Sequence, residues 1–195
     1  IVHIPRNLYH WRVVPGSTAG GIGEKSNAWS AGKRALEAAL ARRSVDGSVN
    51  EGIDPGTYHV SYMTKNTQRV GIIIPTRDRH ELISACVDGI NNTTSWDNIE
   101  TLVINNESTD KATLEWMDSH AGPVIDFPHQ FSYARMMNLA AEQVDADLLL
   151  FLNCDITIIE PNWISAMVGH IQERRVGAVG ARLAFPDGQI QHEGI

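Results

Sequence analysis

Apolar runs and helix-type patterns alternate along the chain from residue 70 to residue 183. The clearest run, residues 148–152, has five consecutive apolar side chains, which is typical of a central strand buried on both faces of a parallel sheet. Further strands are predicted at 70–74, 101–104, 124–125 and 176–183, and helices at 81–90, 110–117, 133–144 and 162–172. This order predicts an α/β fold: a Rossmann-like, mostly parallel central sheet flanked by helices.

The residues before this region follow a different pattern. Residues 27–43 predict a helix whose apolar face carries Ala31, Ala35, Leu36, Ala39 and Leu40, and residues 58–63 predict a short strand. Between them, Gly, Ser, Asn, Asp and Pro are frequent in residues 44–57, which indicates a linker. We therefore divide the chain into an irregular segment (1–23), a helix with its linker (24–67) and an α/β domain (68–195).

Composition excludes several classes of protein. The net charge of −7 argues against a dedicated nucleic-acid-binding protein, which would carry a basic face. Only two cysteines are present, so a disulfide framework is not expected and a reducing compartment, the cytoplasm, is indicated. No apolar stretch reaches the ~18 residues of a membrane span, and no signal peptide is recognised. Because the chain begins with Ile1, we expect it to be part of a longer protein.

Asp155 follows the run at 148–152 and is the first candidate for chemistry. An ionised carboxylate is not buried without a partner, so we expect it to emerge at the carboxyl end of the strand, where ligands bind in open α/β sheets. There it could hold a divalent cation beside a phosphate, with Asn153 next to it. Asp145 and Asp147 form a similar pair, but they precede the strand and belong to the opposite edge.

Two further loops follow predicted strands. The first contains Pro75, which we expect to stop its strand, and is suited either to a nucleotide base or ribose or to an ordinary turn in which Asp78 caps the next helix. The second could offer side-chain amides to a base edge, while Ser108, Thr109 or Asp110 is expected to cap the helix after it. The candidate binding residues of these loops are Pro75, Thr76, Arg77, Asp78, Asn105 and Asn106.

The helix predicted at 133–144 adds Arg135 and Asn138, which share a face and could point to a phosphate or a sugar, although a surface role for Arg135 is the simpler interpretation. The glycine-rich segment 20–26 follows no strand and lacks a glycine directly before its lysine, so it is not interpreted as a phosphate loop. No G-x-G-x-x-G follows the first strand of the α/β domain, which argues against a dinucleotide oxidoreductase.

Taken together and in this order, the motifs at 72–78, 102–110, 149–155, 176–183 and 186–194 resemble the nucleotide-sugar-binding half of a family 2 glycosyltransferase with the type A fold. The resemblance covers residues 68–195. It implies an inverting, metal-dependent transfer of a sugar from a nucleotide diphosphate to a glycan or lipid-linked acceptor, in bacterial surface polysaccharide synthesis. The protein would act in the cytoplasm, with the parent protein peripheral to the inner membrane.

The resemblance also implies roles for particular residues. Pro75, Thr76 and Asp78 would lie near the nucleoside, Asp155 would bind Mg²⁺ or Mn²⁺ bridging the diphosphate, and the helix with Arg135 would border the donor pocket. Asn105 stands where the family commonly has an aspartate, and Glu107 where a glycine is frequent. The first change could alter base preference or weaken donor binding.

The acceptor-binding half, which normally supplies the general base, is expected to lie beyond Ile195, so this chain alone should bind nucleotide but transfer sugar poorly or not at all. Residues 8–12 and 16–18 resemble the closing segment of another catalytic domain of the same family, which predicts tandem transferase domains in the parent protein. Two rival hypotheses are a non-catalytic, degenerate transferase module and a sugar nucleotidyltransferase. The latter should carry a glycine-rich, basic loop after the first strand, where this chain has Pro-Thr-Arg-Asp.

Overall fold

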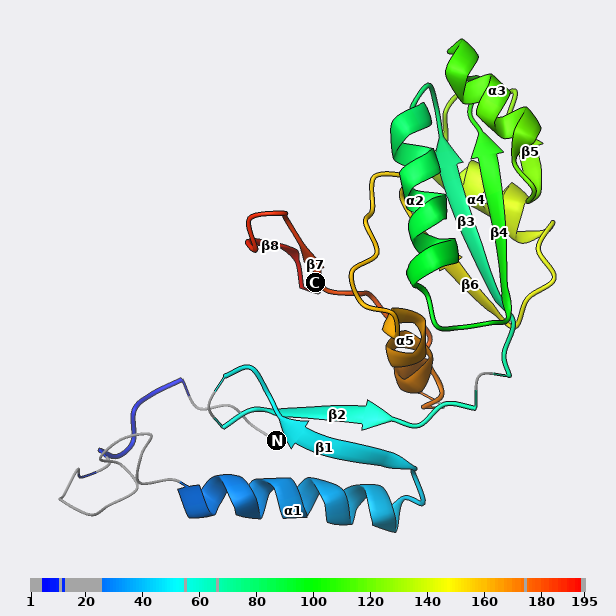
Figure 1. The fold of residues 1–195 in the computed structure, drawn as a ribbon. Helices are drawn as coiled ribbons and strands as arrows, with labels where there is room; N and C mark the ends of the chain where they lie inside the picture. Colours follow the sequence, from blue (N-terminus) through cyan, green and yellow to red (C-terminus); the bar gives the residue numbers. More distant parts are fainter. Residues whose placement is uncertain are drawn as a thin grey trace. The chain divides into compact units, whose positions relative to one another are not determined.

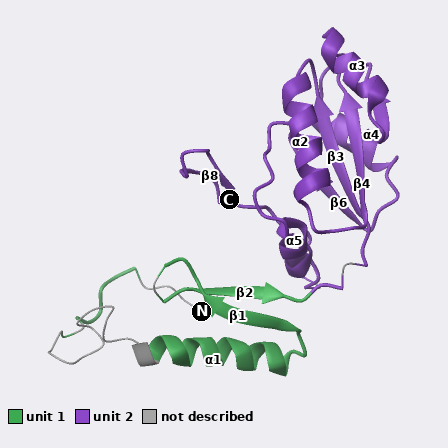
Figure 2. Ribbon diagram, in the orientation of Figure 1, with its two compact units in different colours: residues 1–63 green, residues 64–195 purple. Residues whose placement is uncertain are grey.

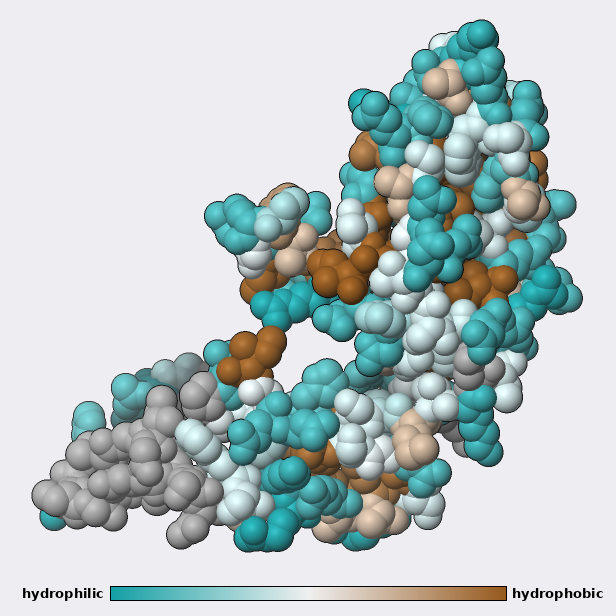
Figure 3. Space-filling view, in the orientation of Figure 1, coloured by the Kyte–Doolittle hydropathy of each residue, from teal (hydrophilic) through white to brown (hydrophobic). Residues whose placement is uncertain are grey.

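The computed structural model describes residues 5–10, 12, 26–54, 56–65, 67–173 and 175–193. The chain forms two compact units, Ile1–Met63 and Thr64–Ile195 (Figure 2). Most of segment 1–23 and residues 20–25 of the glycine-rich segment lie outside the described residues. Hydrophilic and weakly polar residues make up most of the visible surface of each unit, and hydrophobic residues form smaller groups among these polar residues (Figure 3).

The first unit is a helix packed on a two-stranded antiparallel hairpin. Helix α1 (Ser26–Arg42) confirms the predicted helix, and strand β2 (Tyr58–Tyr62) the predicted strand. The Tyr58 hydroxyl donates to the Trp29 carbonyl at 2.7 Å. The linker prediction was wrong in its centre, because β1 (Gly47–Glu51) pairs along its whole length with β2. Of the five β1 side chains only Val49 is buried, so the sequence carries no apolar run that would signal a strand.

Ala31 and Ala35 are exposed, which corrects the predicted apolar face of α1. Leu36, Ala39 and Leu40 are half-buried, which confirms the rest of the predicted face. Trp29, near the start of the helix, is half-buried as well. An alanine pattern alone carries little directional information, because alanine is favourable in helices whether buried or exposed.

The second unit contains the predicted parallel sheet. Its strands are β3 (Val70–Thr76), β4 (Ile99–Asn105), β5 (Val124–Asp126) and β6 (Leu148–Phe151), in the spatial order β5-β4-β3-β6 (Figure 1). All three pairings are parallel. The middle strands β3 and β4 pair in seven registered positions, from Val70 opposite Ile99 to Thr76 opposite Asn105. The α/β prediction is therefore confirmed.

Helices cover both faces of this sheet. On one face, α2 (His80–Thr93), α3 (Lys111–Ser119) and α5 (Trp163–Ile171) contribute to a core with the side chains of Val70, Ile72 and Ile74. On the other face, α4 (Tyr133–Ala141) packs Met136, Met137 and Ala140 on Ile73, Leu102 and Ile104. Since consecutive strand residues point to opposite faces, β3 can supply both cores from one apolar run.

Strand β6 differs from its prediction. It forms an edge of the described sheet, and Leu149 and Phe151 are 41% and 49% exposed. Leu148 and Leu150 pack on the core under α2, so only one face of the strand is covered. An uninterrupted apolar run therefore did not identify a central strand buried on both faces.

Two other boundaries depart from the sequence prediction. Pro75 does not stop β3, which continues to Thr76. Backbone groups of successive β3 residues point alternately to β6 and to β4: Ile73 O accepts from Leu152 N on the β6 side, and Thr76 O accepts from Asn106 N on the β4 side. The Pro75 nitrogen therefore points toward β6. Because β6 has already ended at this level, the missing N–H of proline breaks no hydrogen bond of the sheet. The strand predicted at 176–183 is reduced to β7 (Leu183–Ala184), which pairs antiparallel with β8 (Ile190–His192) around the predicted turn at 186–188.

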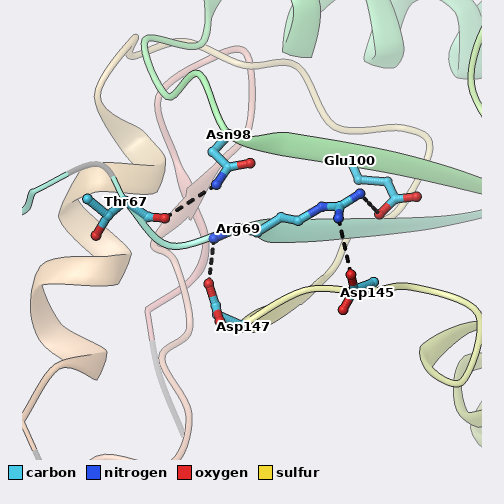
Figure 4. A network of polar contacts seen from close by, with 6 residues as sticks. All are labelled: Thr67, Arg69, Asn98, Glu100, Asp145 and Asp147. Carbon is cyan, nitrogen blue, oxygen red and sulfur yellow. Dashed lines mark hydrogen bonds and ion pairs between the residues drawn. The ribbon is translucent and has the colours of Figure 1, made fainter.

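At the amino edge of the sheet, Arg69 joins the starts of three strands (Figure 4). Its guanidinium lies 2.8 Å from Glu100 and 3.4 Å from Asp145, and its backbone N–H donates to Asp147 at 2.8 Å. Asp145 and Asp147 thus belong to the edge opposite Asp155, in a structural role.

Arg69→Ala should lower the free energy of unfolding by about 1 kcal/mol, a modest amount because the side chain is 41% exposed and solvent screens its ion pairs. Urea denaturation at low and high salt checks this prediction. Arg69→Lys should recover part of the loss, and an alanine variant as stable as the parent at low salt would contradict a stabilising role for the network.

Candidate functional site

The carboxyl ends of β3, β4 and β6 bring three predicted loops to one edge of the sheet. The β3 and β4 ends are level, and Asn106 N donates to Thr76 O at 3.0 Å just beyond them. On the other side of β3, Leu152 N donates to Ile73 O at 3.0 Å, directly before Asn153. The loops after residues 76, 105 and 152 therefore leave the sheet side by side.

Asp78 connects the first two loops. Its Oδ1 accepts from the backbone N–H groups of Thr109 and Asp110 at 2.5 and 2.7 Å, and its own N–H donates to Ser108 Oγ at 3.2 Å. It does not cap α2, whose N-cap is Arg79 without a side-chain bond. The cap of α3 is Asp110, which accepts from Thr113 N at 2.8 Å, so of the three expected caps Ser108 and Thr109 are not used.

The same hydrogen bonds shift the acidity of this loop. The backbone N–H of Asp110, and then that of Thr109, hold the pKa of Asp78 below its ordinary value. The hydroxyl and N–H of Thr113 lower the pKa of Asp110 in the same way. Both carboxylates are thus favoured in their charged form by donors of neighbouring backbone and side chains.

The pKa values of Asp78 and Asp110 are lower in the folded protein than in the unfolded chain, where they are about 4. The two carboxylates therefore stabilise the fold at pH values above the unfolded pKa. This stabilisation is lost as the pH falls through their lower, folded pKa values. We therefore expect the free energy of unfolding to fall with acidification below about pH 4. Asp78→Asn should flatten this dependence, as urea denaturation from pH 2.5 to 7 would show. Equal slopes for parent and variant would contradict the role assigned to Asp78.

Asn105 uses its side chain within the protein. Its Nδ2 donates to Asp126 Oδ1 at 2.8 Å and its Oδ1 accepts from Ser108 N at 2.9 Å. The residue where the family commonly has an aspartate therefore shapes the second loop and ties it to β5. Sequence reasoning did not identify Asp126, because it is the last residue of a strand of only three residues and belongs to no motif.

Thr76 and Asn106 form the buried floor between these loops. Their side chains are 4% and 7% exposed, and Thr76 Oγ1 and Asn106 Oδ1 have no hydrogen-bond partner in the described structure. Pro75 is half-buried, whereas Arg77 and Glu107 are exposed. Glu107 adopts a left-handed conformation with φ of 55°, which explains why glycine would suit its position.

Asn153 and Asp155 are exposed after β6, as predicted. Within the described ranges no cluster of three or more His, Cys, Asp or Glu side chains could hold a metal ion. A single exposed carboxylate such as Asp155 can serve the kind of Mg²⁺ site that uses one or two carboxylates, with phosphates and water as the other ligands. The donor set fits a metal that arrives with a phosphate ligand and does not fit a cage made by protein alone.

Arg135 and Asn138 are exposed on α4, whose cap is Ser132. Their neighbours Met136 and Met137 are buried in the core. Neither Arg135 nor Asn138 makes a side-chain hydrogen bond to the loops described above, so their place in the site stays a prediction.

A pocket of about 600 Å³ lies away from this edge, between α2, the start of β4 and the loop after α3. Arg69, Glu100 and His120 contribute to its lining. Burial lowers the pKa of His120, and its Nε2 has no hydrogen-bond partner. A Cβ added at Gly122 would lie 2.6 Å from His120 Nε2. The His120 nitrogen therefore occupies the space that the glycine leaves open, and we do not interpret it as part of a ligand site.

Comparison with known proteins agrees with this architecture. Residues 71–192 match the family described as glycosyl transferase family 2. The whole chain is 38% identical to an uncharacterized protein of Sinorhizobium fredii and 35% identical to the O-antigen biosynthesis protein RfbC of Myxococcus xanthus. It spans only 22% and 16% of the lengths of these curated relatives.

Among solved structures, a mannosyltransferase from Pyrobaculum calidifontis, in complex with GDP-Man and Mn²⁺, has a similar fold with a TM-score of 0.54. The match covers 86% of this chain and 48% of that one at 20% identity. Of the described helices, none has the length and apolar character needed to cross a membrane. The family match spans more than half of the chain, and the chain therefore belongs to glycosyl transferase family 2.

Proposed function

We propose that the chain binds the nucleotide-diphosphate sugar of a metal-dependent, inverting glycosyltransferase. The observation that carries the proposal is an exposed carboxylate, Asp155, after the carboxyl end of β6, beside the loops that follow β3 and β4. Ligands bind at this edge of open α/β sheets. Within the family, such a site is suited to a nucleotide diphosphate.

Each loop has a separate task in this proposal. Asp155 would hold Mg²⁺ or Mn²⁺ with the diphosphate oxygens, and Arg77 is free to approach the phosphates from the first loop. When bound, the metal would neutralise the charge that develops on the leaving nucleotide diphosphate. Pro75 and Thr76 would lie near the nucleoside, while Asn153 would border the metal side of the pocket.

Asn105 and Asp78 would act on the ligand through the loop that they hold. Asn105 Oδ1 and Asp78 Oδ1 already accept hydrogen bonds from the backbone N–H groups of residues 108–110. We therefore assign base contacts to the backbone of the second loop and to Asn106, whose Oδ1 has no other partner in the described structure.

The relatives suggest the wider setting. RfbC of Myxococcus xanthus is an O-antigen biosynthesis protein, and the Pyrobaculum calidifontis structure holds GDP-Man and Mn²⁺. We propose a role in bacterial surface polysaccharide synthesis, in the cytoplasm and peripheral to the inner membrane, with a glycan or lipid-linked acceptor. The curated relatives are several times longer than this chain, which is consistent with a tandem transferase domain in the parent protein.

Calorimetric titration of the 195-residue chain with UDP, GDP and dTDP, each with and without Mn²⁺, tests the proposal. We expect binding of one nucleotide that is at least about tenfold tighter with Mn²⁺, a difference of ~1.4 kcal/mol. Sugar transfer by the chain alone should be weak or absent. Equal nucleotide affinity with and without Mn²⁺ would contradict the proposed metal site.

One observation favours a second candidate, a degenerate module that binds partners but no nucleotide. Asn105 is fully engaged with Asp126 and Ser108 where the family commonly offers a carboxylate. Failure of the full-length parent protein to bind any of the three nucleotides would favour this alternative.

A further inference from the structure

The segment that carries Asp155 runs along helix α2 and is attached to it at both ends. At the far end, Trp163 Nε1 donates to Thr94 Oγ1 at 3.0 Å, and Ser95 N donates to Pro161 O at 2.8 Å. Between the ends, Ile158 lies over Gly89, where an added Cβ would be 3.6 Å from the Ile158 side chain. Helix α2 therefore acts as a support for the whole segment from residue 153 to residue 163.

At the near end, the support is a cysteine thiol. Cys86 is 1% exposed in the core under α2, and its Sγ donates to the Asn153 carbonyl at 3.7 Å. Cys154 and Ile158 pack on the same core, so the turn after β6 rests on the face of α2 that contains Cys86. The thiol is thus directly beneath the backbone that presents Asp155.

The thiol keeps its proton under ordinary conditions. Burial, and next the nearby Cys154 and Asp155, raise the pKa of Cys86 to about 11, although a hydrogen bond with the Ile156 backbone acts in the opposite direction. At neutral pH the group is therefore an S–H donor and not a thiolate.

We propose that Cys86 is a positioning residue, which holds the turn at residues 153–156 so that Asp155 faces the metal and diphosphate. The inference rests on the proposed function and deepens it, since it names the group that fixes the orientation of Asp155. Sulfur is a weak donor, so the thiol would act by fixing backbone geometry together with close packing. Small displacements of metal-supporting groups are costly, typically 10–100-fold in metal affinity.

The experiment compares Cys86→Val, which removes the donor and is slightly larger than cysteine, with Cys86→Ser, which keeps a donor. Val87→Ala is the matched control, since Val87 is also buried on α2 and belongs to the same core. Two readouts are used on the 195-residue chain: hydrogen exchange of a peptide spanning residues 152–157, and Mn²⁺ affinity in the presence of the nucleotide found by calorimetry, followed by electron paramagnetic resonance.

We expect Cys86→Val to speed exchange in residues 152–157 and to weaken Mn²⁺ binding about 3–10-fold. This is less than the roughly 10–100-fold typical of groups that hold a metal ligand directly, because a thiol is a weak donor. Cys86→Ser should remain within about twofold of the parent, as should Val87→Ala, even if either lowers thermal stability. Unchanged exchange and Mn²⁺ affinity in Cys86→Val would overturn the inference, and so would an equal loss in Val87→Ala. If the parent chain binds nucleotide without any need for Mn²⁺, the proposed function falls and the positioning role falls with it.

Discussion

Replacing Asp155 with alanine should weaken Mn²⁺-dependent binding of the nucleotide diphosphate by about 100-fold, or ~2.7 kcal/mol, the scale of a lost charged partner. The side chain is exposed after β6, so its removal should leave the fold intact. Binding measured without metal should change little, because only the metal-mediated part of the affinity is removed. Calorimetry with and without Mn²⁺ separates the two contributions.

Asp145→Asn is the matched control. Asp145 belongs to the other Asp-x-Asp-like pattern, but it is fully exposed at the amino edge and contributes one ion pair to Arg69 at 3.4 Å. Its substitution should leave nucleotide affinity within about twofold, since a screened surface pair is worth little. Equal losses in the two variants, or none in Asp155→Ala, would refute the assignment of the metal to the carboxyl edge.

Restoring the aspartate common in the family, by Asn105→Asp, should destabilise this chain by about 1–2 kcal/mol at pH 7. Asn105 and Asp126 are register partners on β4 and β5, and the amide Nδ2 lies 2.8 Å from Asp126 Oδ1. The substitution would replace a hydrogen bond by two facing carboxylates. Urea denaturation of the parent and the variant measures the difference.

The pH dependence and a double variant give this prediction its control. The carboxyl introduced at position 105 should have a raised pKa, so the variant should match the parent at low pH and lose stability as the pH rises through that pKa. Asn105→Asp combined with Asp126→Asn should restore the pair with donor and acceptor exchanged. A double variant no more stable than Asn105→Asp would show that the two side chains are not coupled.

The sequence was sufficient for the scaffold because its signals are local and strong. The parallel strands β3 and β4 and the four helices around the sheet follow from apolar runs and helical periodicity. The wrong predictions concern segments whose structure depends on pairing with another strand, which the residues of one segment alone do not reveal. Strand β1 is mostly polar and is defined by its pairing with β2, while residues 176–181 are apolar or glycine but find no strand partner in the described structure.

In the candidate site, too, the positions of the loops could be predicted from the sequence, whereas the contacts between them could not. The parallel direction predicted for the strands implies that the loops after β3, β4 and β6 lie at one edge of the sheet, and the structure places them there. The interactions between the loops could not be predicted. Asp78 binds residues 109 and 110 some 30 positions away in the chain, and Cys86 lies under Asn153, because tertiary packing alone determines such pairs.

The ladder between β3 and β4 has a consequence for how this architecture diversifies. Because the bond from Asn106 N to Thr76 O uses main-chain atoms only, the rim beyond the strands is anchored whatever side chains occupy it. Arg77 and Glu107 are exposed on that anchored rim, so mutations there carry little risk of misfolding, provided that the residue at 107 tolerates its left-handed backbone, as glycine and asparagine do. Evolution, or a library restricted to positions 77 and 107, can therefore explore new ligand preferences while the two buried cores of the sheet are left untouched.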